Sequence, residues 1–300
     1  MTGTDEPDGA PLGREVAREK AAAIRAQHRK QERRRRVLIV GGIVVAVLAI
    51  VAIVTTSLLG SIKPERTGPL NMLSDGIRIE AGLAALKTSG LPVSATPVPN
   101  APTASADVVD IRFYVDYACG DCSSFATANA EQLRTWVESG AATLEVHPIA
   151  TLDAKSKDYS SRAANAAACV ANYDPDRFFD FNERLLQQAP DEGESLSDDD
   201  LGDIVAEAGV GSASAVEDCI TEDSFATWVS HATERALAGP IAGSDVQQVT
   251  ELPLVLVNGM QFSGPYDDAT AFSQFVVQAA GATFAETSTE TPTDSATATP

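Results

Sequence analysis

A long uncharged, apolar run interrupts the charged residues near the beginning of the chain. Residues 37–59 are 23 consecutive residues without a charged side chain, rich in Val, Ile, Ala and Leu. At about 1.5 Å per residue, a helix of this length spans a hydrocarbon core of about 30 Å. A cleaved signal peptide has a shorter apolar core and a small-residue cleavage site, which this run lacks. The pattern predicts a retained transmembrane signal-anchor helix over residues 37–59.

The charges on the two sides of this run indicate its orientation. Residues 1–36 carry ten Lys and Arg against six Asp and Glu, with four consecutive arginines at 33–36. Residues 60–300 carry 12 basic and 36 acidic residues. Because basic flanks favour the cytoplasmic side, we expect a cytoplasmic tail over residues 1–36 and a single-pass protein of the cell membrane with an extracytoplasmic domain. The acidic part would repel phosphate backbones, which argues against nucleic-acid binding.

Composition separates linkers from a folded domain. Residues 60–106 are rich in Pro, Gly, Ser, Thr and Ala and predict an extended tether, within which Ile77–Ile79 has the pattern of a short strand. Residues 285–300 form a Thr, Ser, Pro and Glu tail that we expect to be disordered. The folded domain is therefore expected over residues 107–284.

The first part of this domain has the pattern of a strand–helix–strand unit. Residues 108–115 are β-branched and aromatic, and residues 142–149 are a second apolar stretch. Between them we expect a helix from Cys119 to Ser139, ended by Gly140. A crossover of this length places the two strands side by side and parallel.

Helical patterns then fill residues 154–238. Pro175 suits a first helical position, and Ser197 with Asp200 has the spacing of a capping box. An apolar strand follows Pro253, Asn258-Gly259 predicts a hairpin, and a last helix is expected over residues 267–280. Residues 154–238 are thus a helical insertion between two strand-rich parts.

Cysteine placement suggests redox chemistry. Cys119 and Cys122 lie two residues apart where a helix should begin, so the helix dipole and free N–H groups would stabilise a Cys119 thiolate. Such a pair can cycle between dithiol and disulfide through a mixed disulfide. A purely structural disulfide has the same spacing, as does half of a zinc site, but zinc needs four Cys or His ligands and the chain has no second tight pair. We expect neither a metal nor a cofactor.

The other two cysteines fall in the helical block. All four cysteines follow residue 100, which indicates an oxidising compartment. With Cys119 and Cys122 as one pair, a structural disulfide between Cys169 and Cys219 is expected. The rival interpretation is two buried free thiols.

Three features in this order resemble one family. They are Phe113-x-x-Asp116-x-x-Cys119-x-x-Cys122 after a strand, an interval of 130 residues, and Leu252-Pro253 before a strand and hairpin. Over about residues 108–280 the chain resembles membrane-anchored DsbA-like thiol:disulfide oxidoreductases of the thioredoxin superfamily. The resemblance implies an α/β thioredoxin-like fold with a helical insertion, preceded here by one transmembrane helix.

The resemblance also implies roles for individual residues. Cys119 would exchange with substrate, and Cys122 would resolve the mixed disulfide. Pro253 would be cis and lie beside the cysteines, with the backbone at Leu252 receiving a substrate strand. Asp116 could relay protons to Cys122, or equally could be a strand-end carboxylate that binds a turn.

The sequence departs from the family pattern near the cysteines. Gly120-Asp121 stands where oxidising members often have Pro-His, and a carboxylate there disfavours the Cys119 thiolate. Leu252 replaces the Thr or Val common before the proline. Ala118 precedes Cys119 in place of the tryptophan of many reductases, which favours an oxidising role.

The expected activity is disulfide formation in exported proteins that carry free thiols. A membrane partner would then reoxidise the cysteine pair, and the resemblance implies an enzyme of the DsbB or vitamin K epoxide reductase type. The alternatives are a reductase or isomerase of the same fold and a non-enzymatic thioredoxin-like binding module.

Overall fold

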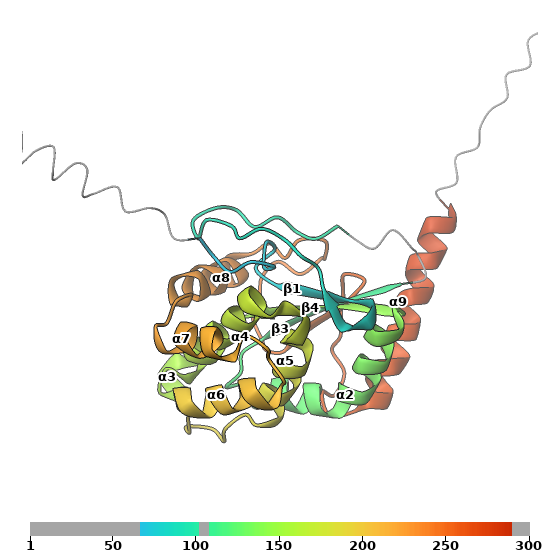
Figure 1. Ribbon diagram of the computed structural model, residues 1–300. Helices are drawn as coiled ribbons and strands as arrows, with labels where there is room; N and C mark the ends of the chain where they lie inside the picture. Colours follow the sequence, from blue (N-terminus) through green and yellow to red (C-terminus); the bar gives the residue numbers. More distant parts are fainter. Residues whose placement is uncertain (1–66, 102–107, 290–300) are drawn as a thin grey trace, which may run out of the picture. The chain divides into compact units, whose positions relative to one another are not determined.

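The computed structural model describes residues 67–101 and 108–289, with side chains up to residue 282 (Figure 1). The predicted cytoplasmic tail and the predicted membrane anchor at residues 37–59 lie outside these ranges. Within them, no helix combines the length and the apolar character needed to cross a lipid bilayer.

A mixed six-stranded sheet forms the centre of the domain, in the order β2-β1-β4-β3-β5-β6. β3 and β4 are parallel, with Ile111 opposite Leu144, which confirms the strand–helix–strand prediction. The other neighbouring strands pair antiparallel. The strands are β1 (Ile77–Glu80), β2 (Ala84–Ala85), β3 (Val109–Val115), β4 (Ala142–Pro148), β5 (Leu254–Val257) and β6 (Met260–Gln261).

The crossover from β3 to β4 is the helix α2 (Gly120–Ser139). Gly140 ends it in the left-handed conformation with φ 77°, as the sequence indicates. Phe125, Leu133 and Val137 lie on the buried face of α2. These side chains pack the helix against the hydrophobic core of the domain.

Short helices form the insertion between β4 and β5, as predicted. The capping box of Ser197 and Asp200 is present at the start of α6. A disulfide joins Cys169 on α4 to Cys219 on α7, with 5.9 Å between their Cα atoms, and both residues are buried. The elements are α3 (Asp153–Ser156), α4 (Tyr159–Tyr173), η2 (Pro175–Arg177), α5 (Phe178–Gln187), α6 (Asp198–Glu207), α7 (Ala213–Thr221) and α8 (Ala226–Ala238).

The domain begins earlier than the tether prediction placed it. Residues 67–101 lie against the domain, and the strand expected around Ile77–Ile79 is β1, paired antiparallel with β4. Ile77 and Ile79 are fully buried, and a bidentate ion pair joins Asp75 to Arg235 on α8 at 2.6 and 2.7 Å. The loop-like composition of residues 67–101 did not predict this packing. The segment is held by its contacts with β4 and α8 and has no periodicity of its own.

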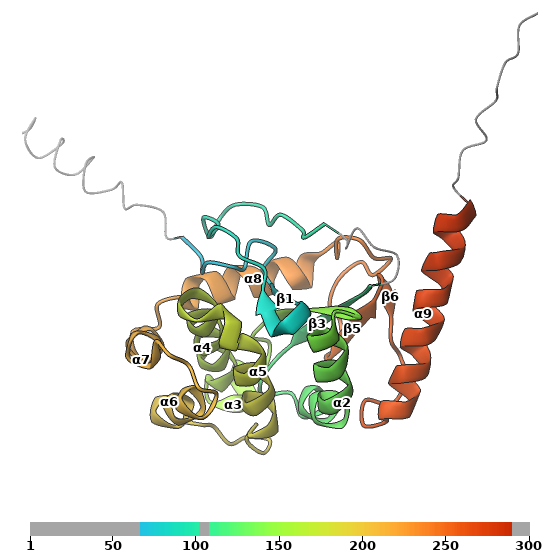
Figure 2. The ribbon, with the colours of Figure 1, turned by 45° about the vertical axis from the view of Figure 1, so that its right-hand side comes forward.

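The last helix extends further than expected. α9 (Ala269–Thr289) continues nine residues beyond the predicted end at 280, into the segment predicted as a disordered tail (Figure 2). Phe272 anchors α9 on α2, with its ring centroid 4.9 Å from that of Phe125 in an edge-to-face arrangement. Gly281 does not end the helix. The rest of the predicted tail, residues 290–300, lies outside the described ranges.

Candidate functional site

Cys119 links the end of β3 to the first turn of α2. It is the N-cap residue, with extended backbone, and its sulfur accepts a hydrogen bond from the Cys122 N–H at 3.1 Å. Its carbonyl accepts from the N–H groups of Cys122 and Ser123. The sulfur therefore lies where the partial positive charge of a 20-residue helix favours a thiolate.

Cys119 and Cys122 form a disulfide whose two sulfurs differ in access. Their Cα atoms are 5.2 Å apart. Cys119 is 7% exposed, whereas Cys122 is 0% exposed. An approaching thiol can therefore reach the Cys119 sulfur and not the Cys122 sulfur, which is the asymmetry that disulfide exchange requires.

The Leu252–Pro253 peptide bond is cis, as the resemblance implied. β5 pairs antiparallel with β3, and Leu254 lies opposite Tyr114. The start of β5 is therefore beside the end of β3, after which Cys119 follows. Pro253 is buried and accepts a hydrogen bond from the Tyr266 hydroxyl at 3.1 Å, while half-buried Leu252 and Cys119 line the same cavity.

Asp116 holds two loops together behind the cysteines. Its buried carboxylate accepts hydrogen bonds from the N–H of Ala118 at 2.9 Å, of Thr151 at 2.7 Å and of Leu152 at 3.0 Å. The Thr151 hydroxyl adds a fourth at 3.1 Å. These contacts fit the turn-binding alternative for Asp116, and a proton relay to Cys122 stays a prediction.

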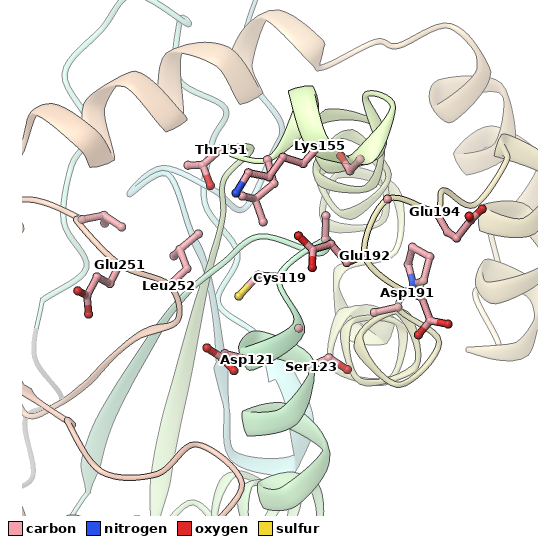
Figure 3. A pocket seen from close by; sticks show the side chains of 18 of the residues that line it. Cys119, Asp121, Ser123, Thr151, Lys155, Asp191, Glu192, Glu194, Glu251 and Leu252 are labelled. Carbon is pink, nitrogen blue, oxygen red and sulfur yellow. The ribbon is translucent and has the colours of Figure 1, made fainter.

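A cavity of about 600 Å³ opens around the Cys119 sulfur (Figure 3). Four chain segments line it. They are residues 118–121 and 123 at the start of α2, residues 151, 152, 155 and 156 after β4, residues 189–194 between α5 and α6, and residues 249–252 before the cis proline, with Leu237 from α8. Cys119 and Leu252 both line this cavity.

Sequence reasoning missed Thr151, Leu152 and the loop at 189–194 as parts of this site. A signal for the first two was present, since β3 and β4 are parallel and their carboxyl ends meet at one edge of the sheet. No local signal places the 189–194 loop, because its position depends on how α5 packs on α2.

Asp121 lies in the first turn of α2 and lines the same cavity as Cys119. We expect Asp121→His to lower the pKa of the Cys119 thiol in the reduced protein, because a negative charge near the thiolate is replaced by a group that can be positive. Ultraviolet absorbance of the thiolate, followed across pH, measures this. Asp121→Asn is the matched control that removes the charge alone, and identical titrations for wild type and Asp121→His would contradict the expectation.

Known proteins share this architecture. A family model described as thioredoxin matches residues 102–276. The reduced form of the disulfide bond oxidoreductase DsbG from Mycobacterium tuberculosis has a TM-score of 0.50 and 23% identity, over 73% of this chain and 95% of that one. Oxidised BdbD from Bacillus subtilis has a TM-score of 0.50 and 15% identity, over 73% and 100%. No curated protein sequence matches the chain significantly.

Proposed function

The chain belongs to the thioredoxin family, and on that premise we propose that it is a DsbA-like thiol:disulfide oxidoreductase that forms disulfides in exported proteins. One observation carries the proposal. It is the disulfide at the start of α2, with the Cys119 sulfur facing a cavity and the Cys122 sulfur enclosed. The Leu252–Pro253 segment beside that sulfur supports it further.

The exchange proceeds in two displacements on sulfur. A substrate thiolate attacks the Cys119 sulfur, the Cys119–Cys122 bond breaks, and Cys122 leaves as a thiolate that takes up a proton. A second substrate thiolate then attacks the substrate sulfur of the mixed disulfide, and Cys119 leaves as a thiolate. The substrate thiols lose two electrons and two protons in total. The cysteine pair gains both electrons, Cys122 takes up one proton, and the other proton goes to solvent while Cys119 is a thiolate.

The oxidising direction follows from which sulfur leaves last. The N-terminus of α2 stabilises the Cys119 thiolate, and a more stable leaving group makes the release of oxidised substrate more favourable. Asp121 acts against this, so we propose a weaker oxidant than a Pro-His enzyme. A membrane partner, a quinone-linked enzyme of the DsbB or vitamin K epoxide reductase type, would accept the two electrons.

The cellular placement is part of the proposal. The uncharged run at residues 37–59 behind an arginine block supports a single-pass anchor with the domain outside the cytoplasm. A second disulfide, Cys169–Cys219, supports the same oxidising compartment.

A trapping variant tests the proposal in cells. Cys122→Ala leaves Cys119 without the thiol that resolves mixed disulfides, so exported proteins should accumulate covalently on Cys119. Non-reducing electrophoresis would show adducts that a reductant releases. The double variant Cys119→Ala/Cys122→Ala is the control and should capture nothing. Equal capture by both variants, or none by Cys122→Ala, would reject the proposed activity.

A further inference from the structure

Acidic side chains surround the Cys119 cavity on several sides. Asp121 comes from α2, Asp191, Glu192 and Glu194 from the loop between α5 and α6, and Glu251 from the loop before the cis proline. Figure 3 shows Asp121 and Glu192 on either side of the Cys119 sulfur. Lys155 on α3 is the one basic residue among the lining residues that the structure describes. The wall is therefore negative although its segments are far apart in the sequence.

Most of these carboxylates have no charged partner. In the part of the chain that the structure describes, Glu194 forms an ion pair with Lys157 at 3.6 Å, and the remaining four acidic residues of the cavity form none. Arginines elsewhere are engaged away from the cavity, for example Arg134 with Asp180 at 2.7 Å. Among residues 67–101 and 108–282, basic side chains thus leave most of the negative charge at the cavity unpaired.

Two of these carboxylates, Glu251 and Asp121, lie close enough to Tyr266 to act on its hydroxyl. Burial raises the pKa of Tyr266, and the charges of Glu251 and Asp121 raise it further. Tyr266 donates a hydrogen bond from its hydroxyl to the carbonyl of Pro253, which directly follows Leu252 on the cavity wall. Glu251 directly precedes Leu252 and lies beside the chain that would bind there.

We propose that this cavity selects polypeptide segments that carry Lys or Arg beside the reacting cysteine. The inference rests on the proposed function and names its substrate class. Unpaired carboxylates along a concave wall raise the local concentration of cationic segments and speed their encounter. Anionic segments would have to bring further negative charge against Glu192 and Glu251.

Peptide oxidation by the oxidised full-length protein in detergent tests the proposal. Three peptides share one sequence with two cysteines and differ only in flanking residues, which are two arginines, two serines or two glutamates. Because flanking charge also changes the reactivity of a thiol, each rate is divided by the rate of the same peptide with a neutral small-molecule disulfide. We expect the second-order rate constant for single-turnover oxidation of the cationic peptide to exceed that of the anionic one by about tenfold at low ionic strength, and by about twofold in 0.5 M salt.

Variants localise the effect. Glu192→Gln combined with Glu251→Gln should lower the cationic-to-anionic ratio about threefold. Glu138→Gln is the matched control, since Glu138 is exposed in the last turn of α2, about 27 Å further along the helix than Gly120. This control should leave the ratio unchanged.

The results distinguish a failure of the proposed charge selectivity from a failure of the proposed oxidoreductase function. Oxidation of all three peptides at equal normalised rates would overturn the charge selectivity and leave the oxidoreductase intact. An equal loss of selectivity in Glu138→Gln would assign the effect to the general acidity of the domain and would also overturn it. Oxidation of no peptide would reject the proposed function itself.

Discussion

Cys119→Ser should reduce disulfide formation in a dithiol peptide to the uncatalysed rate. A hydroxyl cannot form the mixed disulfide, and the remaining thiol at Cys122 is 0% exposed, so no second sulfur can take over from within the pair. The other two cysteines are joined on α4 and α7 and are also buried. Stopped reactions, in which free thiols are counted over time, measure the rate.

Cys122→Ser provides the comparison. This variant should also fail in turnover, but its reduced Cys119 should form a stable mixed disulfide with an activated disulfide reagent, whereas Cys119→Ser should not. Circular dichroism identical to that of the wild type shows that both variants are folded. If Cys119→Ser supports disulfide formation in cells as well as the wild type, the non-enzymatic binding module becomes the better interpretation.

Removing the Cys169–Cys219 disulfide should lower the free energy of unfolding and leave thiol–disulfide exchange at Cys119 unchanged. The Cys169–Cys219 bond closes a loop with a sequence separation of 50, and in the chain-entropy account such a cross-link contributes about 4 kcal/mol to the free energy of unfolding. We expect Cys169→Ala/Cys219→Ala to lose about that amount in urea denaturation. Alanine is the appropriate replacement because both sites are buried and a serine hydroxyl would lack a partner there.

A second pair of cysteines controls for the loss of two sulfur atoms. Cys119→Ala/Cys122→Ala opens a disulfide whose sequence separation is only 3, so the free energy of unfolding should change much less. A loss below about 1 kcal/mol in Cys169→Ala/Cys219→Ala would contradict the stabilising role assigned to that bond.

Local signals predicted much of the fold. The helix after Cys119 and its end at Gly140, the helix beginning at Ser197 and the hairpin at Asn258-Gly259 all lie where short sequence patterns place them. Each depends on conformations that a few neighbouring residues prefer. Asn258 and Gly259, for example, take positive φ values of 49° and 81° in the hairpin turn.

Segments without local periodicity were assigned less well. Residues 67–101 were predicted mainly as a tether, yet Ile77 and Ile79 are buried against β4. The last helix was predicted to end at residue 280, whereas the structure continues α9 to Thr289. For residues 67–101 composition describes what the segment prefers alone, and its contacts with β4 and α8 outweigh that preference.

The sequence by itself determined the reactive group, because the position of Cys119 at the start of a helix depends only on adjacent residues. Only the tertiary structure decided what surrounds that sulfur. Pairing of β5 with β3 brings Leu252 and Glu251 beside it, and the fold of the insertion brings Glu192 from a loop 73 residues further along the chain. Side chains so distant in sequence share a cavity only through packing, and that is why the proposed charge selectivity had no counterpart in the sequence pattern.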